Sequence, residues 1–209
     1  MQETKNFTNY KLQVHDRILD AAMRDFAKLG IKATKMDDLA IALGISKRTI
    51  YEIFGTKEGL LFECIRRRHL CKTQEIALYA ANHDVVDTVV HLYRASIDES
   101  TALTPGFYEE LSKYPEIMRY QEQQKDRNQQ NFLSFINRGI NEGYFRSDIN
   151  YEIITHVFDA LQTYIHSNSL YQRYSVEDLF FNMLFVPVRG FCTPKGIQKL
   201  DRLFEESKG

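Results

Sequence analysis

The sequence is poor in the residues that interrupt helices. Its 209 residues include four Pro, ten Gly and no Trp. Proline removes a backbone donor and clashes with the preceding turn, and glycine loses more conformational freedom on ordering than other residues do. Neither an apolar–polar alternation of period two nor an internal repeat is found, which disfavours strands and repeat architectures. The sequence therefore predicts an all-α protein with long helices.

Long apolar runs and cysteines are also scarce. No apolar run reaches the roughly 20 residues of a bilayer-spanning helix, and the polar segment from Met1 to Lys11 lacks the apolar stretch of a secretory signal. Three cysteines fit a reducing compartment. We therefore expect a cytoplasmic protein without a membrane span.

Motifs typical of enzymes and metal sites are missing as well. The sequence has no Gly-rich phosphate loop, no nucleophile elbow and no zinc motif. We therefore expect no metal, no cofactor and no enzymatic activity. Four histidines are not spaced as metal ligands of one helix face would be: His83, His91, His156 and His166.

The formal net charge of −1 results from an uneven distribution of charge along the chain. Residues 1–72 contain 14 Lys and Arg against 9 Asp and Glu, a net charge of +5. Residues 73–209 contain 13 Lys and Arg against 19 Asp and Glu, a net charge of −6. This asymmetry is expected when only the first part of a protein meets nucleic-acid phosphates.

The first part of the chain has the pattern of helices separated by glycines. Apolar residues recur at three- and four-residue steps from Leu12 to Leu29, which predicts an amphipathic helix that ends at Gly30. Thr34, with Asp37 three residues later, is the predicted N-cap of the next helix. The helices expected after it are 35–43, 47–54 with Ser46 as its cap, and 57–81 with Thr56 as its cap.

The remaining chain is expected to be helical throughout. Gly143 and the residues after it mark a turn, and proline or capping residues precede several apolar periodic runs. The expected helices are 84–99, 105–113, 115–141, 150–168, 175–190 and 194–206.

Residues 36–53 fit a helix-turn-helix, in which two short helices cross steeply. The crossing needs a small residue on the first helix, which is Ala40, and the turn needs a residue that tolerates a left-handed backbone, which is Gly44. An ordinary helical hairpin with a basic face is the alternative, because this spacing is common. The facing sides carry apolar residues for a small core: Leu39, Leu43, Ile45, Ile50 and Ile53.

The second helix of this motif has polar residues on its outer face. Lys47, Arg48 and Thr49 open it, and Tyr51 follows. These residue types contact phosphates and base edges in DNA. For Tyr51 the alternative is an aromatic ring packed beside Phe54.

The residues around the motif resemble the N-terminal domain of the TetR family of transcriptional regulators. The resemblance covers about Arg17 to Leu61, while the remaining chain is similar only in helical pattern and length. The residues that carry it are Arg17-Ile-Leu-Asp-Ala-Ala, Phe26, Gly30, Thr34, Leu39-Ala40, Gly44-Ile-Ser-Lys-Arg-Thr-Ile-Tyr51, Phe54 and Lys57-Glu58-Gly-Leu60-Leu61.

The resemblance implies two domains. Residues 1–56 would form a three-helix, helix-turn-helix DNA-binding domain. Residues 57–209 would form a helical bundle that binds a ligand and dimerises, with residues 57–81 as the linking helix.

The resemblance also implies the DNA contacts. In the family the positions of Thr34, Tyr51 and Lys57 commonly contact phosphate, and the first residues of the recognition helix face the major groove. Here those first residues are Lys47, Arg48 and Thr49. Arginine can bind guanine through two parallel hydrogen bonds, and Lys57 would add its charge to the positive end of its helix.

In the C-terminal region the resemblance suggests a small-molecule pocket and a dimer interface. The alternative for both sets is the core of one chain. The predicted pocket residues are Phe107, Tyr108, Phe135, Phe158, Gln162 and Tyr164. The predicted interface residues are Val176, Leu179, Phe180, Met183 and Leu184.

These features together predict a TetR-like homodimeric transcriptional regulator, most simply a repressor that a small-molecule effector releases from double-stranded, palindromic operator DNA. A protein of the same fold whose C-terminal domain binds a protein partner is the alternative. A helical enzyme or metal protein with an incidental helix-turn-helix is a third hypothesis.

Overall fold

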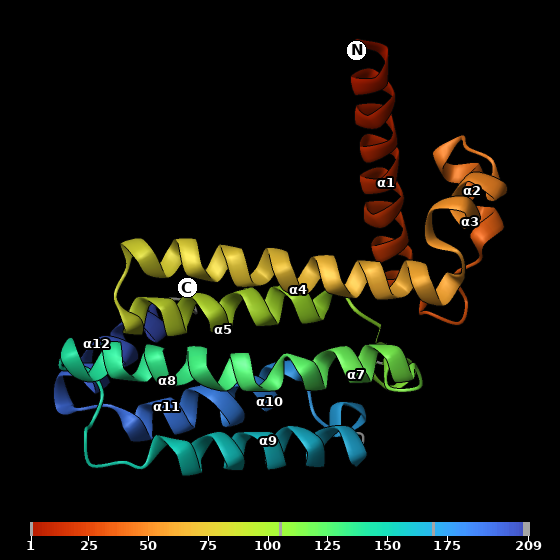
Figure 1. Cartoon of the computed structure of the whole chain (residues 1–209). Coiled ribbons are helices and arrows are strands. Elements are labelled where there is room, and N and C mark those ends of the chain that lie inside the picture. The colour runs from red at the N-terminus through yellow and green to blue at the C-terminus, as the bar shows by residue number, and fades with distance from the viewer. Residues whose placement is uncertain (1, 105, 169, 207–209) are drawn as a thin grey trace. The chain divides into compact units, whose positions relative to one another are not determined.

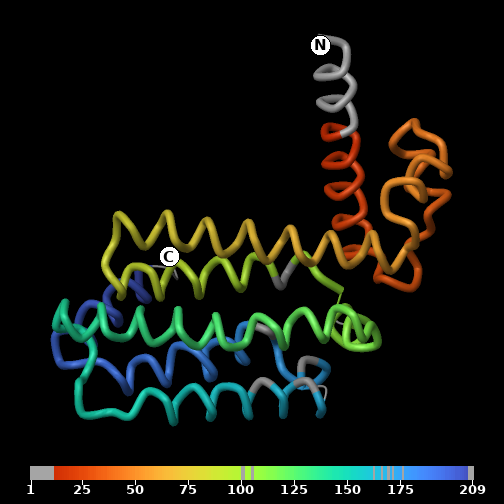
Figure 2. The backbone as a smooth tube through the Cα atoms, viewed as in Figure 1, coloured from red at the N-terminus to blue at the C-terminus, as the bar shows by residue number. Residues whose placement is uncertain are grey.

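The computed structural model is built from helices (Figure 1). It describes residues 2–104, 106–168 and 170–206, with side chains at all of these except 2–11, 100, 101, 162, 166, 171 and 176 (Figure 2). Within this part of the chain every regular element is helical, and one isolated antiparallel bridge joins Phe145 to Cys192. The prediction of an all-α fold is confirmed. None of the helices described combines the length and the apolarity needed to cross a bilayer.

The chain forms two compact units, and the first unit contains the predicted helix-turn-helix. It consists of the residues up to Cys71 together with the distant segment Ala102–Arg119. Its elements are α1 (Gln2–Leu29), α2 (Met36–Leu43), α3 (Lys47–Phe54), the first part of α4 (Lys57–Asn82), α6 (Phe107–Leu111) and the start of α7 (Pro115–Gln123).

Both sequence segments of the first unit contribute to one apolar core. Its fully buried side chains include Ile18, Phe26, Ile31, Leu39, Ile50, Leu60, Leu61, Phe107 and Ile117. The compact unit is therefore larger than the residues 1–56 predicted from the sequence. The boundary after residue 56 stays a prediction of where the DNA-binding domain ends, since compactness describes packing alone.

The second unit contains Lys72–Thr101 and the residues from Tyr120 onward. In it α8 packs against both α5 and α9, and α5 also packs against α10 and α12 (Figure 1). Its elements, besides the ends of α4 and α7, are α5 (Val85–Thr101), α8 (Lys125–Asn141), α9 (Tyr151–Ser167), the 3-10 turn η1 (Leu170–Gln172), α10 (Val176–Phe180), the π-helical segment η2 (Phe181–Phe185), α11 (Val186–Phe191) and α12 (Pro194–Glu205).

Two helices expected to be continuous are interrupted. The helix predicted over 115–141 is divided at Gln124, whose backbone nevertheless keeps right-handed helical dihedral angles. The helix predicted over 175–190 contains a π-helical segment at 181–185. Pro187 lies two residues after this segment, and a proline inside a helix lacks the N–H and clashes with the carbonyl four residues before it. A wider turn just before the ring relieves that clash.

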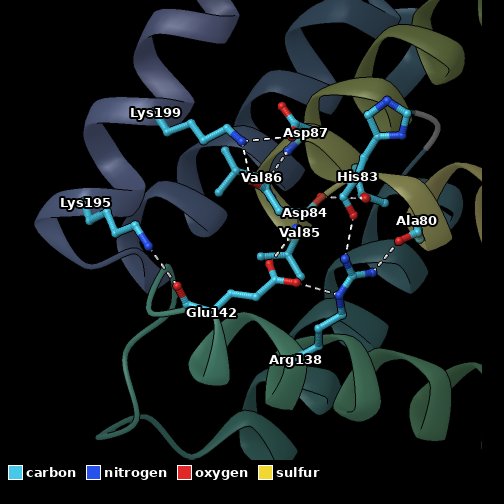
Figure 3. A network of polar contacts seen from close by, with 11 residues as sticks. Ala80, His83, Asp84, Val85, Val86, Asp87, Arg138, Glu142, Lys195 and Lys199 are labelled. Carbon is cyan, nitrogen blue, oxygen red and sulfur yellow. Dashed lines mark hydrogen bonds and ion pairs between the residues drawn. The ribbon is translucent and has the colours of Figure 1, made fainter.

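A polar network closes the end of α4 and the start of α5 within the second unit (Figure 3). Arg138 on α8 donates to the carbonyl oxygens of Ala80 and His83, at 2.5 Å each, and to the carboxylate of Glu142 at 2.6 Å. Glu142 in turn accepts from the backbone N–H of Val85 at 3.0 Å. Orphan carbonyls at the end of one helix and an orphan N–H at the start of the next are thereby satisfied.

The same network contains a lysine held by two carboxylates (Figure 3). Lys199 on α12 bonds to Asp84 and to Asp87, the latter at 2.8 Å. Burial alone would raise the pKa of Asp84, but the bond from Lys199 and the N–H of Asp87 outweigh it and lower the pKa. Asp84 also accepts from the N–H of Val86 at 3.0 Å, so it caps α5.

Candidate DNA-binding site

The turn between α2 and α3 has the backbone geometry that the sequence predicts. Gly44 adopts the left-handed conformation, with φ of 65° and ψ of 32°. The next residue, Ile45, donates its N–H to the carbonyl of Ala40 at 3.1 Å, which closes the end of α2. Ser46 then caps α3, because its hydroxyl accepts from the N–H of Thr49 at 3.0 Å. The predicted caps Ser46 and Thr56 are confirmed, since Thr56 accepts from the N–H of Gly59 at 2.9 Å.

A small apolar core holds the two helices together. Leu39 and Ile50 are fully buried, and Ala40 is 5% exposed at the crossing. Leu43 and Ile45 are half-buried against the same core. The prediction for Ile53 is wrong, because its side chain is 37% exposed. The ring of Phe54 occupies the core instead, so the helix presents the position before it to solvent.

The predicted recognition face of α3 lies on the outside of this core. Arg48 has an 86% exposed side chain, and Lys47 and Tyr51 are exposed as well. Thr49 is half-buried, and its hydroxyl shares a 2.8 Å hydrogen bond with that of Ser46. Tyr51 projects beside Lys47, whose ammonium lies 5.9 Å from the centre of the ring. The alternative for Tyr51, a ring packed beside Phe54, is therefore not the arrangement found, because Tyr51 is 39% exposed.

Both basic side chains at the start of α3 are paired with carboxylates of the same unit. Lys47 lies 2.7 Å from Asp37, and this hydrogen bond raises the pKa of Lys47. Arg48 donates its Nε hydrogen to Glu52 at 2.7 Å, one helical turn later. Exposed pairs of this kind are weak and exchange readily with other partners. Both side chains are therefore available to DNA.

Thr34 does not have the local role predicted for it. Lys35 occupies the N-cap position of α2, without a side-chain capping bond. Thr34 is 3% exposed, and its hydroxyl donates to the carbonyl of Gly30 at 2.9 Å. Its N–H also donates to Gly30, at 3.2 Å, so Thr34 closes the turn between α1 and α2. Because the buried hydroxyl of Thr34 bonds backward to the preceding turn, Thr34 does not cap α2, and Lys35 occupies the N-cap position.

Lys57 is the first residue of α4, as predicted. Its ammonium donates to the carbonyl of Lys32 at 3.2 Å. The pKa of Lys57 is lowered, because the effect of burial outweighs that of the carboxylates of Glu58 and Glu110, which act to raise it. An ammonium has three donors, so the bond to Lys32 leaves two for a phosphate.

The predicted pocket residues are divided between the two units. Phe107 and Tyr108 belong to the core of the first unit, and Phe135 and Phe158 pack in the second. Tyr164 is 58% exposed on α9. The side chain of Gln162 lies outside the described residues.

A cavity of about 610 Å³ is found elsewhere in the second unit. It combines aromatic and aliphatic side chains with two arginines, which are paired with Asp148 and Asp201. None of the predicted pocket residues whose side chains are described lines it. The lining residues are Arg146, Phe181, Phe185, Val186, Arg189, Gly190, Cys192 and Ile197.

The predicted interface residues with described side chains, which are Leu179, Phe180, Met183 and Leu184, are half-buried. Phe180 and Leu184 pack on the core of their own unit, Leu179 and Met183 are partly exposed, and the side chain of Val176 lies outside the described residues. Three large side chains on α9 are also exposed, and none of them belongs to the predicted interface set. Ile153, Val157 and Tyr164 recur at intervals of four and seven residues, a signal that was present in the sequence.

No metal site is formed by the described side chains, in which no three His, Cys, Asp or Glu residues gather. The three cysteines are free thiols.

An exposed basic recognition helix on a helix-turn-helix core, joined to a helical second unit, defines a DNA-binding transcription regulator. Residues 18–64 match the family profile "Bacterial regulatory proteins, tetR family". The chain is a TetR-like DNA-binding transcriptional regulator, and its residues 18–64 are similar to the regulatory proteins of the tetR family.

Curated relatives agree with this assignment. The chain is 28% identical over 158 residues to the HTH-type transcriptional repressor KstR2 of Mycobacterium tuberculosis, a match that covers 68% of this chain and 76% of that protein. It is 26% identical over 142 residues to KstR2 of Rhodococcus jostii, over 65% of this chain and 70% of that protein.

Solved structures show the same fold. A transcriptional regulator from Saccharomonospora viridis, solved in complex with choline, has a TM-score of 0.67 at 20% identity, over 87% of this chain and 98% of that one. A TetR-family regulator from Agrobacterium tumefaciens has a TM-score of 0.64 at 17% identity, over 88% of this chain and 100% of that one.

Proposed function

We propose that the chain acts in the cytoplasm as a homodimeric repressor that a small-molecule effector releases from a palindromic operator, with no catalytic role. The observation that carries this proposal is the exposed, basic face of α3 above a closed core. The relatives named as repressors support the sign of regulation.

In this proposal α3 enters the major groove. Lys47, Arg48 and Thr49 read base edges, with Arg48 bound to a guanine through its guanidinium. The exposed pair of Arg48 with Glu52 is weak, so a guanine can displace the carboxylate from the guanidinium. The phosphate contacts are made by Tyr51 and Lys57, and by the segment around Thr34 at the start of α2.

Dimerisation is proposed because one recognition helix covers few base pairs. An eight-residue helix is about 12 Å long, and two copies on one side of the duplex read two half-sites one helical turn apart. The exposed side chains of Ile153, Val157 and Tyr164 on α9 would meet the partner, together with Val186 on α11. The residues that the sequence predicts for the interface come shortly before Val186 in the chain and are part of the same proposed interface. They are Val176, Leu179, Phe180, Met183 and Leu184.

The effector would bind in the second unit and favour a conformer in which the two recognition helices no longer match the operator. Phe135, Phe158, Gln162 and Tyr164 are the predicted residues within this unit, and Phe107 and Tyr108 complete the predicted set. The cavity beside Phe185 and Arg189 offers a second candidate position.

A gel-shift assay with the DNA upstream of the protein's own reading frame tests the DNA-binding part. We expect R48A to weaken binding to the cognate duplex about tenfold and to leave non-specific binding nearly unchanged. We expect K57A to weaken binding to all sequences and to flatten the salt slope by about one.

The matched control is R202A, which removes an exposed cation of the second unit that pairs with Glu206 at 3.9 Å. It should leave both binding modes intact. Loss of all sequence-specific binding by the wild-type protein at moderate salt would refute the proposal. The effector part is tested separately, with a panel of small molecules in thermal denaturation, because a ligand of the native state raises the melting temperature.

A further inference from the structure

A segment distant in the sequence completes the core beneath the helix-turn-helix. Phe107, Leu111 and Ile117 are buried in the same cluster as Phe26 and Ile31 of the N-terminal helices. The end of α1 is closed by the same segment, because the N–H of Thr104 donates to the carbonyl of Ala27 at 2.8 Å. The residues that bind DNA are therefore supported by a part of the chain that no DNA-binding motif contains.

One polar side chain of this segment contacts the turn between α1 and α2. Glu110 accepts a hydrogen bond from the backbone N–H of Lys32, at 2.8 Å. The carbonyl of Lys32 accepts from the ammonium of Lys57 at 3.2 Å. Lys32 is therefore held through its N–H by one charged group and through its C=O by the other.

The turn needs this support because of its backbone. Gly30 has a φ of 91°, in the region that favours glycine, and its carbonyl accepts from both the N–H and the hydroxyl of Thr34. A Cβ at Gly30 would lie 3.5 Å from the carboxylate of Glu110, so the side chain lies directly against the turn. A carboxylate bound to a backbone N–H makes a strong, charge-assisted hydrogen bond.

We propose that Glu110 is a positioning residue for DNA binding. It fixes the turn over residues 30–34, and through the carbonyl of Lys32 it fixes the ammonium of Lys57 where that group meets a phosphate. This inference rests on the proposed function, since it assigns the support of the same DNA contacts.

The sign of the expected effect separates positioning from simple charge. A carboxylate near the DNA-binding face repels phosphate, so removing its charge strengthens binding if Glu110 acts only by its field. Positioning predicts the opposite for any variant that loses the hydrogen bond to Lys32.

Two conservative variants divide these contributions. E110Q loses the charge and keeps an oxygen that can accept from Lys32, whereas E110D keeps the charge and is one methylene too short. We expect E110D to bind operator about fivefold more weakly than wild type and E110Q to stay within about twofold. The matched control is E109Q, which removes the neighbouring α6 carboxylate and should bind at least as tightly as wild type.

A second measurement needs no DNA. In E110D the N–H of Lys32 should exchange with solvent faster than in wild type and in E109Q, while amides of the α1 interior keep their protection.

Changing Lys57 provides the third readout. If Glu110 acts through Lys57, the fivefold loss in E110D should shrink toward unity when K57A is already present.

Several outcomes would overturn the inference. These are wild-type affinity and wild-type Lys32 exchange in E110D, tighter binding in both E110D and E110Q, or an undiminished loss in the K57A background. If wild-type protein binds no duplex while Lys32 exchange responds as expected, the proposed function fails and the support of the turn by Glu110 stands.

Discussion

The two units satisfy their helix ends in different ways. In the first unit the polar groups come from a few residues away: Ser46 caps α3, Thr56 caps α4, and Gly44 lets the backbone of α2 close on itself. In the second unit local caps such as Ser175 and Thr193 are joined by bonds from far along the chain, as Arg138 closes α4 and Lys199 bonds to carboxylates at the start of α5. Local caps stabilise the α2–α3 motif, whose shape must match DNA. Long-range bonds connect helices of the second unit that are distant in the sequence.

Within the first unit, Glu110 and Thr104 are exceptions to this pattern. They satisfy the turn after α1 from 70 or more residues away. The two helices of the motif are closed mainly by local bonds, apart from the one that Arg17 donates to the carbonyl of Leu43 at 3.3 Å, and the turn before them is closed by distant residues.

The largest test compares one buried leucine from each unit. Leu39 and Leu200 are both fully buried. We expect L39A and L200A each to lower the free energy of unfolding by about 2–5 kcal/mol, measured by chemical denaturation. At a temperature where both variants are folded, L39A should lose operator binding because the α2–α3 crossing loosens, whereas L200A should keep it. Equal losses of DNA binding would remove the distinction between the units.

The second test breaks the long-range closure of α4. R138M keeps the apolar stem but loses the bonds to the carbonyls of Ala80 and His83. We expect a loss of about 2 kcal/mol in the free energy of unfolding, since the carbonyls of Ala80 and His83 both lose a charged hydrogen-bond donor. R146M is the control, because Arg146 pairs only two residues away with exposed Asp148 and should change stability little. Similar stabilities for the two variants would show that distance along the chain does not matter here.

The third test uses pH. The pKa of Asp84 is lowered in the folded protein, so its charged form is favoured by folding. This contribution is fully present above the unfolded value and is lost as the pH falls through the folded pKa. We expect the free energy of unfolding of wild type to fall more steeply in acid than that of D84N, which keeps an oxygen to cap α5. Parallel curves would place the acid sensitivity elsewhere.

The smallest test labels the thiols without unfolding the protein. Burial raises the pKa of Cys64 to about 12 and that of Cys192 to about 11, while Cys71 is exposed. At about pH 8 a maleimide should therefore label Cys71 quickly and the other two slowly. The slow rates report local opening of the first unit at Cys64 and of the second unit at Cys192. Rapid labelling of Cys64 would contradict a closed core in the first unit.

Much of the first unit could be predicted, with identifiable exceptions. The caps Ser46 and Thr56 and the left-handed Gly44 follow from residue chemistry at fixed spacing. The prediction that Thr34 caps α2 is wrong because a threonine beside a turn can bond either forward as a cap or backward to a preceding carbonyl. Ile53 was misplaced because two adjacent apolar residues at a helix end compete for one core position, and Phe54 takes it.

The second unit was predicted only as a set of helices. The π-helical segment before Pro187 departs from the period on which the 175–190 prediction rests. The predicted pocket joined rings that the chain places in two different cores, Phe107 and Tyr108 in one and Phe135 and Phe158 in the other. Apolar periodicity identifies a buried face without identifying the face against which it packs.

By itself, the order of residues determined an all-helical chain with a DNA-reading motif near its start, because caps, turns and apolar spacing act over one or two helical turns. Only the three-dimensional packing decided that Phe107 lies beneath that motif, that Glu110 supports the turn beside it, and that Arg138 closes the end of α4. Those contacts join residues 55 or more positions apart, and pairing over such distances depends on shape and charge across the whole core rather than on any local pattern.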